Sequence, residues 1–211
     1  MIRAIVFDMG NVLLRFQPQL VSRLCTENEA DAQQLYAGLF QSPEWAMTDS
    51  GALSDPEFLE RVIPRLPPHL QEAGRRAFAC WDQYLPPVPG IEELLRGLKA
   101  AGYRLYVCSN ASRRFFSYTT PLPMFSLFDG ILVSAVERCV KPDPAIYQRL
   151  FERFSLDPAQ CLFIDDLPAN IQGGRACGME GIVFDGEVSH LRQSLEQLGV
   201  RPAATEPTTT K

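Results

Sequence analysis

The chain has 211 residues, of which 46% are hydrophobic and 21% charged, and its formal net charge is −5 at pH 7. This composition is typical of a globular protein with one domain, or with one domain and a smaller insertion. The acidic balance argues against a nucleic-acid or anionic-membrane partner, and no apolar run approaches the ~20 residues of a membrane-spanning helix.

Short β-branched and aromatic runs predict strands, and amphipathic runs between the later ones predict helices. The first predicted strand covers residues 3–7. The other predicted strands cover residues 104–108, 130–134, 161–164 and 181–184. Between them, apolar side chains recur at helical spacing, as at Ile91, Leu94, Leu95 and Leu98. Strands that alternate with helices favour an α/β fold with a parallel sheet covered on both faces.

Residues 16–87 interrupt this alternation between the first and second strands. They contain several helical stretches and no convincing strand, so we expect an inserted helical domain of residues 16–87. The core domain would then comprise residues 1–15 and 88–199. Residues 200–211 are polar and aperiodic, which predicts a disordered tail.

Polar side chains follow each of the first four predicted strands. They are Asp8, then Ser109 and Asn110, then Lys141 a few residues on, and finally Asp165 and Asp166. In a parallel sheet the carboxyl ends of the strands meet at one edge, where ligands bind. Three carboxylates at one edge require a positive partner, and Mg²⁺ prefers oxygen ligands. The pattern predicts a site for Mg²⁺ and a phosphate ester, with Asp8 as a carboxylate nucleophile.

Each of these features alone has a simpler interpretation. An aspartate after a strand is usually a turn residue, and a Ser-Asn pair is usually a helix cap. The six cysteines form no C-x-x-C pair, which favours reduced, buried thiols in a cytosolic chain. Without a basic leader segment or an unassigned apolar stripe, we expect a cytoplasmic monomer that acts on a small molecule.

Taken together, four motifs resemble those of the haloacid dehalogenase-like (HAD) hydrolase superfamily. The stretches are "VFDMGNVL", "VCSN", "VKPDPAIY" and "FIDDLPANI", in this order. The resemblance covers about residues 1–199, and residues 16–87 stand where family members carry a helical C1 cap. It implies a Rossmann-like core, a closing cap, Mg²⁺, and hydrolysis of a phosphate ester.

The resemblance also implies roles for individual residues. Asp8 would be the nucleophile and a metal ligand, and the carbonyl oxygen of Gly10 would be a second ligand. Ser109 and Asn110 would bind the transferring phosphoryl group, and Lys141 would balance its charge. Asp166 would ligate Mg²⁺ directly, and Asp165 would do so directly or through water.

Gly10 departs from the usual motif of the superfamily's phosphatases. They carry an aspartate there, which protonates the leaving oxygen and then activates water. Such general acid–base catalysis typically contributes ~10²–10⁴-fold. Because the proposed ligand at residue 10 is a backbone carbonyl, glycine keeps the metal site and removes the acid.

Three interpretations follow from Gly10. The chain is a phosphatase whose leaving group needs less help, or whose cap or a water supplies the proton. The D-x-G-N-V form, which resembles α-D-glucose-1-phosphate phosphatases, favours a sugar phosphate. Alternatively, the chain binds metal and a phosphorylated ligand with little turnover. In the third interpretation it is a dehalogenase or phosphonatase. The acid pair Asp165–Asp166 argues against a dehalogenase. The absence of lysine from residues 16–87 argues against a phosphonatase.

Further residues are weaker candidates. Trp45 and Asp49 lie where the cap would set specificity, Trp45 as a core residue or a sugar platform and Asp49 as an acceptor for a sugar hydroxyl. Asn11 is assigned to a turn, with contact to the cap as the alternative. We expect Asn170 to position Asp166 or to start a helix. Arg113 and Arg114 are assigned to a solvated helix face, with contact to a phosphate or sugar as the alternative.

Overall fold

The computed structural model describes residues 1–204. Its core is a parallel sheet of five strands in the order β3-β2-β1-β4-β5. The strands are β1 (Ala4–Phe7), β2 (Arg104–Ser109), β3 (Gly130–Val133), β4 (Cys161–Asp165) and β5 (Glu180–Val183). The predicted α/β fold with a parallel, Rossmann-like sheet is confirmed, and each strand lies within one residue of its predicted position at either end.

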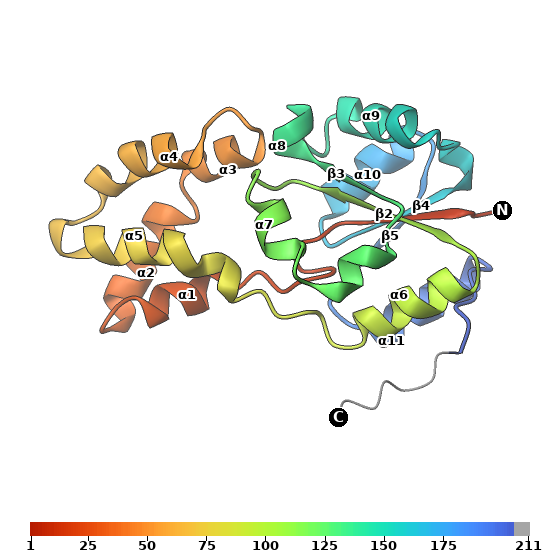
Figure 1. The fold of residues 1–211 in the computed structure, drawn as a ribbon, viewed down its shortest axis with the longest axis horizontal. Helices are drawn as coiled ribbons and strands as arrows, with labels where there is room; N and C mark the ends of the chain where they lie inside the picture. The colour runs from red at the N-terminus through yellow and green to blue at the C-terminus, as the bar shows by residue number, and fades with distance from the viewer. Residues whose placement is uncertain (205–211) are drawn as a thin grey trace.

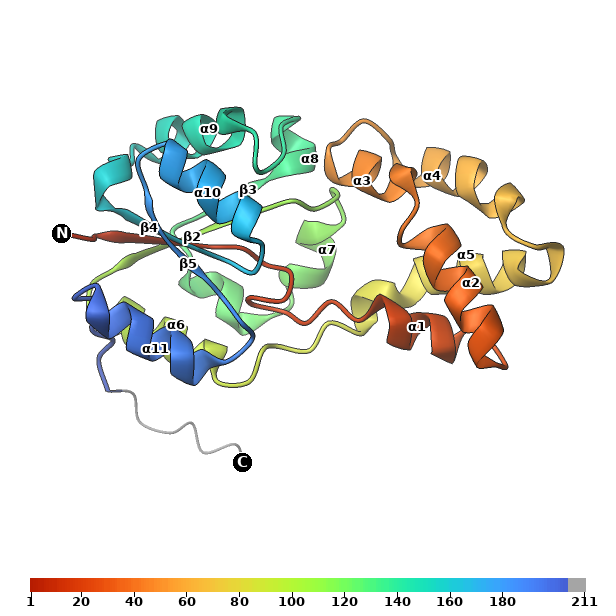
Figure 2. The same cartoon turned by 180° about the vertical axis from the view of Figure 1, so that it is seen from behind.

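Helices cover both faces of the sheet (Figures 1 and 2). The helices that follow the first crossover are α6 (Ile91–Ala100), α7 (Phe115–Thr119), α8 (Ser134–Glu137), α9 (Pro144–Phe154), α10 (Pro168–Ala176) and α11 (Val188–Gln197). The pairs α9/α10 and α6/α11 lie on opposite faces. Short 3₁₀ turns are η4 (Pro123–Leu127) and η5 (Pro158–Gln160).

The alternation of side chains along β1 explains the two cores. Ala4 and Val6 belong to the apolar cluster that includes Ile146 and Leu150 of α9. Ile5 and Phe7 belong to the larger cluster that includes the apolar stripe of α6. Because successive side chains of a strand point to opposite faces, a fully apolar strand fills both cores at once.

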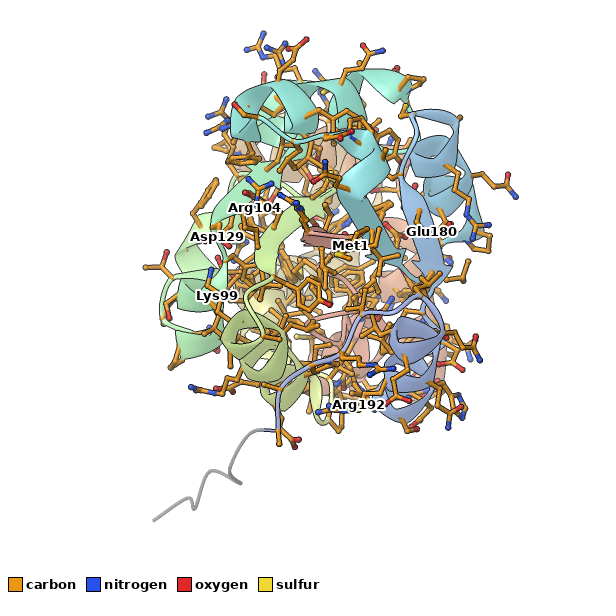
Figure 3. All side chains as sticks on the ribbon, turned by 90° about the vertical axis from the view of Figure 1, so that its right-hand side faces the viewer. Met1, Lys99, Arg104, Asp129, Glu180 and Arg192 are labelled. Carbon is orange, nitrogen blue, oxygen red and sulfur yellow. The ribbon has the colours of Figure 1, made fainter. Side chains whose placement is uncertain are left out.

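The amino edge of the sheet is held by surface charges (Figure 3). Lys99 of α6 lies 2.6 Å from a carboxylate oxygen of Asp129, and the other oxygen accepts the Leu105 N–H at 2.8 Å. Arg104 and Met1 lie at the same end of the molecule. This edge fixes β2 and lies opposite the strand ends that carry the predicted site.

The segment between β1 and α6 is helical throughout its regular structure and extends away from the sheet (Figure 1). Its elements are α1 (Pro18–Leu24), α2 (Glu29–Leu39), α3 (Pro43–Asp49), α4 (Asp55–Val62), η1 (Ile63–Arg65), η2 (Pro68–Leu70), α5 (Gln71–Cys80) and η3 (Trp81–Gln83). Below, residues 16–87 are called the helical insertion. Among residues 1–204, no helix has the length and apolar character needed to cross a membrane.

The two chain segments that join the insertion to the core lie side by side. Arg15 donates its N–H to the Pro86 carbonyl at 2.9 Å, and Val88 donates to the Leu13 carbonyl at 3.0 Å. Leu14 and Pro87 form an isolated antiparallel bridge. This pairing coincides with the predicted boundaries of the helical domain, which remain a prediction.

The prediction of a disordered tail is wrong for its first residues, 200–204. Val200 is buried, and Ala203 donates its N–H to the Gly97 carbonyl of α6 at 2.9 Å. The missing side chain of Gly97 allows this approach, because a Cβ there would lie 2.7 Å from the Ala203 oxygen. Residues 205–211 of the predicted tail lie outside the described residues.

Gly51 of the helical insertion packs closely against the core. Its φ is +72°, and a Cβ there would lie 2.4 Å from the carbonyl oxygen of Ala135 in α8. Gly51→Ala should therefore lower the free energy of unfolding by about 1–3 kcal/mol, because strain and a clash add. Urea denaturation measures this loss.

Gly102→Ala is the matched control. Gly102 has a φ of +88°, but a Cβ there would meet no described atom within 4 Å. Gly102→Ala should lower the free energy of unfolding by less than Gly51→Ala does. Equal losses would mean that the close approach of Gly51 to Ala135 adds nothing to the cost of the substitution.

Candidate active site

The carboxyl edge of the sheet brings the predicted residues together, as expected. Asp8 follows β1, Asp165 ends β4 and Asp166 comes next. One oxygen from each of these carboxylates can be chosen so that all three lie within 4.8 Å of one another. Such a set fits a hard divalent cation, which prefers carboxylate and carbonyl oxygens.

Lys141 is the cation inside this acidic cluster. It is 3% exposed, and its Nζ lies 2.7 Å from Asp8 Oδ1 and 2.7 Å from Asp165 Oδ2. Burial lowers the pKa of Lys141, but the two facing carboxylates outweigh burial, so its pKa is raised above the usual value. The ammonium group therefore stays charged and ties two carboxylates into one unit.

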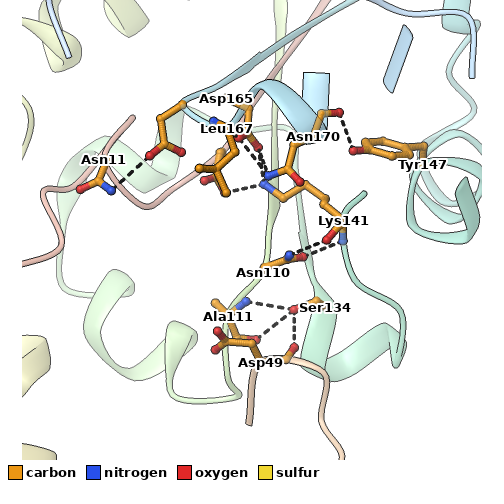
Figure 4. Close-up of polar contacts among 12 residues, drawn as sticks. Asn11, Asp49, Asn110, Ala111, Ser134, Lys141, Tyr147, Asp165, Leu167 and Asn170 are labelled. Carbon is orange, nitrogen blue, oxygen red and sulfur yellow. Dashed lines mark hydrogen bonds and ion pairs between the residues drawn. The ribbon is translucent and has the colours of Figure 1, made fainter. Parts of the chain in front are cut away.

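Asn110 positions the backbone of Lys141 (Figure 4). Its side-chain amide donates to the Lys141 carbonyl at 2.9 Å, and its side-chain oxygen accepts the Lys141 N–H at 2.8 Å. Asn110 also lines the pocket beside Asp8. Sequence reasoning assigned it to phosphoryl binding and missed this role in holding the loop.

Asp8 has a raised pKa of about 6. Burial is the largest cause, Lys141 opposes it, and the negative charge of Asp165 adds to it. The Asp8 N–H donates to the Ile164 carbonyl of β4 at 2.8 Å, which fixes the start of the turn. A bound cation would favour the ionised carboxylate that a nucleophile needs.

Asp165 is fully buried, and its carboxylate is held by neighbours on every side (Figure 4). Besides Lys141, the Asn170 amide lies 3.0 Å from both of its oxygens, and the Leu167 N–H donates to Oδ1 at 2.8 Å. Asn170 lies in the first turn of α10, which agrees with the predicted helix start, but its amide binds Asp165 and not Asp166. These contacts make Asp165 the anchor of Lys141.

Asp166 lines the pocket, whereas Asp165 does not. It is half-buried, and Asn11 donates its side-chain amide to Asp166 Oδ2 at 3.2 Å. Burial raises the pKa of Asp166 above its usual value. Asn11 also has a φ of 55° and accepts the Phe16 N–H at 3.2 Å, so it serves the turn as predicted and also reaches the acidic cluster.

Gly10 lies within the turn that follows Asp8 and lines the same pocket. A Cβ at this position would meet no described atom within 4 Å. A larger side chain would therefore fit, so packing does not require glycine here. The space for the family's usual acid is present, and the acid is missing.

The pocket above the acidic cluster has a cavity volume of about 240 Å³ and an aromatic wall. From the helical insertion and its return segment come Trp45, Asp49, Trp81 and Leu85, and Phe16 lies at its entry. Trp45 stands 5.9 Å from Phe16 and 5.3 Å from Trp81 between ring centres. Trp45 is therefore both part of an aromatic cluster and part of the wall.

Ser109 occupies a less exposed place than expected. It is 1% exposed at the end of β2 and, within residues 1–204, is not among those lining the pocket. Asn110, Ala111 and Ser112 line it instead. Sequence reasoning missed Ser112 and Tyr118, which face the pocket because of the turn after β2, a feature with no signal in the residue pattern.

The assignment of Arg114 to a solvated face is wrong, and its neighbour Arg113 lies away from the acidic cluster. The Arg114 side chain is 20% exposed and lies 2.5 Å from Asp82 of η3. It also donates to the Phe78 carbonyl at 2.7 Å. Arg114 thus joins the core to the helical insertion. Arg113 is exposed and lines a separate hollow with Asp55.

The parallel sheet and the acidic cluster at its carboxyl edge define an α/β protein with a candidate site at that edge. The chain belongs to the haloacid dehalogenase-like hydrolase family, whose model matches residues 2–178. The resemblance found in the four motifs is therefore confirmed.

Comparison with individual proteins agrees with this family. The chain is 26% identical to a sesquiterpene phosphatase of Aspergillus oryzae, with 92% of this chain and 91% of that protein covered. It is 31% identical to haloacid dehalogenase-like hydrolase domain-containing protein 3 of Mus musculus, over 54% of this chain and 47% of the mouse protein. It thus spans about half of that second relative.

A solved structure has the same fold. A HAD-family enzyme of Bacteroides thetaiotaomicron, in complex with magnesium and inorganic phosphate, superposes with a TM-score of 0.68 at 19% identity. The match covers 90% of this chain and 99% of that chain.

Replacing Lys141 tests the electrostatics of the cluster. Lys141→Met should cost about 3–5 kcal/mol of unfolding free energy at pH 7.5 in metal-free buffer, because two buried carboxylates lose their partner. The loss should shrink at pH 5. Asp8 already has a folded pKa above its unfolded value, so its ionisation costs stability as pH rises.

Urea unfolding at the two pH values measures this difference. Lys99→Met is the control, because the Lys99–Asp129 pair is more than one-third exposed and should contribute at most about 1 kcal/mol. An equal loss for Lys141→Met at both pH values would contradict the electrostatic explanation.

Proposed function

We propose that the chain is a Mg²⁺-dependent phosphatase that hydrolyses a small phosphorylated metabolite through an aspartyl-phosphate on Asp8. The observation that carries the proposal is the buried Lys141, which bridges Asp8 and Asp165 while Asp166 faces the same pocket. This arrangement places a carboxylate beside a fixed cation at a pocket. It suits attack on a phosphoryl group whose charge must be balanced.

The proposed metal ligands are Asp8, Asp166 and the Gly10 carbonyl, with Asp165 acting directly or through water. Bound there, Mg²⁺ would neutralise negative charge on the carboxylates and the phosphoryl oxygens. Lys141 would hold the phosphoryl group against Asp8, and Ser109 with the Asn110 backbone would contact its oxygens. The helical insertion would serve as the cap, with hinges near residues 16–18 and 86–90.

The substrate's organic part would contact the aromatic wall. The D-x-G-N-V motif supports a sugar phosphate such as glucose 1-phosphate, and sugars pack on aromatic rings. The wall of Phe16, Trp45, Trp81 and Leu85 supports, as a second candidate, an ester with an apolar group. The relative from Aspergillus oryzae, a sesquiterpene phosphatase by name, supports the same candidate.

Phosphate release tests the function. The panel contains glucose 1-phosphate, glucose 6-phosphate, a nucleoside monophosphate, farnesyl phosphate and p-nitrophenyl phosphate, each with Mg²⁺ or with EDTA. We expect release that requires Mg²⁺ and falls to background in Asp8→Asn, which keeps the shape of the side chain and removes the nucleophile. Release that survives in Asp8→Asn would overturn the proposal. No release from any ester, together with Mg²⁺ binding, would instead favour a binding protein.

Thermal unfolding tests the metal site without relying on turnover. Mg²⁺ at 100 times its dissociation constant should stabilise the folded protein by about 2.7 kcal/mol and raise Tm. Asp166→Asn should abolish most of this shift. Asp185→Asn, at a surface carboxylate paired with His190, is the control and should keep the shift. A full shift in Asp166→Asn would remove Asp166 from the metal site.

A further inference from the structure

The missing side chain at residue 10 leaves the proposed reaction without its usual proton carrier. Among the residues that line the pocket, the ionisable side chains are Asp8, Asp49, Tyr118, Lys141 and Asp166. Asp8 is the proposed nucleophile, Asp166 the proposed metal ligand, and Lys141 is bound to two carboxylates. Burial raises the pKa of the Tyr118 hydroxyl well above its usual range, which makes it a poor proton donor. Asp49 remains.

Asp49 is the last residue of α3, and the core holds that end of the helix in place (Figure 4). Ser134, at the start of α8, donates its hydroxyl to the Asp49 carbonyl at 2.5 Å. Two residues later, Gly51 packs against the backbone of Ala135. Both contacts join the helical insertion to the core beside the pocket that Asp49 lines, so they hold the backbone at Asp49 in place.

The side chain of Asp49 is directed at the same place. Its carboxyl group lies beside the backbone N–H of Ser112, and it lines the pocket with Asp8 and Gly10. Asp8 follows β1 of the sheet, whereas Asp49 ends α3 of the helical insertion, and both line the pocket. A phosphoryl group on Asp8 would project into the pocket that Asp49 also lines.

We propose that Asp49 is the general acid and general base of this enzyme and replaces the aspartate that is absent at residue 10. This inference rests on the proposed phosphatase function. In the first step, a bond forms between Asp8 and phosphorus, the ester P–O bond breaks, and the leaving oxygen takes the proton of Asp49. In the second, the Asp49 carboxylate takes a proton from water, the water oxygen bonds to phosphorus, and the Asp8–phosphorus bond breaks.

The environment of Asp49 supports this role. Burial raises the pKa of Asp49 to about 8, the Ser112 N–H opposes that rise, and the charge of Asp8 adds to it. A raised pKa favours the protonated carboxyl group that a general acid needs at the start of the reaction. The negative charge of Asp8 acts on Asp49, and the charge of Asp49 in turn helps to raise the pKa of Tyr118.

The test compares leaving groups. A general acid matters for an alkyl ester, whose leaving oxygen is strongly basic, and hardly for p-nitrophenyl phosphate, whose leaving group is stable as an anion. In Asp49→Asn we expect kcat/KM to fall ~10²–10⁴-fold for the best alkyl ester of the panel and less than tenfold for p-nitrophenyl phosphate. For the latter, kcat should also fall, with a burst of one p-nitrophenol per enzyme, because the base for the second step is gone.

Two further variants sharpen the result. Gly10→Asp in the Asp49→Asn background should restore activity on the alkyl ester, because residue 10 has space for the side chain. Asp55→Asn is the matched control: Asp55 is another partly buried carboxylate of the insertion, but it lies outside this pocket. It should keep kcat/KM for both esters.

The outcomes separate this inference from the proposed function. Activity that survives Asp8→Asn overturns the proposed function and this inference with it. Equal losses on both esters in Asp49→Asn, or no loss on either, overturn the inference alone. Asp49→Ser repeats the comparison with a smaller side chain, and far-UV circular dichroism with urea unfolding shows that each variant is folded.

Discussion

The ion pairs of Lys141 with Asp8 and Asp165 are the interaction on which the rest of the site depends. Three carboxylates within a few ångströms of one another would repel, and burial would add to the cost of charging them. Lys141 offsets that repulsion from inside the protein, and the side chains of Asn110 and Asn170 hold its backbone and its partner in position. The remaining carboxylate, Asp166, is left facing the pocket.

The helical insertion completes the pocket because specific contacts hold it against the core. Ser134 and Ala135 meet the backbone at Asp49 and Gly51, and Arg114 reaches from α7 to the insertion. The contacts of Asp49 and Gly51 lie where α3 of the insertion meets α8 of the core (Figure 1). The aromatic wall and the acidic edge therefore face the same cavity, which suits a ligand with an anionic end and an organic body.

Gly10 bears on both the acidic edge of the sheet and the pocket beneath the insertion. In the proposed site the backbone carbonyl of Gly10 would bind the metal, while the absent side chain leaves open space in the pocket. In the proposed mechanism Asp49 of the insertion supplies the acid–base carboxyl group that is absent at residue 10. A carboxyl group carried by the insertion is present at the reacting atoms when the insertion lies against the core, so proton transfer would be linked to closure.

The residue pattern alone was enough to predict the parallel α/β sheet, because strand and helix periodicities are local properties of neighbouring residues. It also placed Asp8, Lys141 and Asp166 at one edge, because the carboxyl ends of parallel strands meet there. The tertiary structure decided the rest. Two contacts depend on the loops and on how the insertion packs. Asn170 binds Asp165, and Arg114 pairs with Asp82. Such contacts between residues far apart in the chain leave no periodic signal, since they arise when separate elements meet.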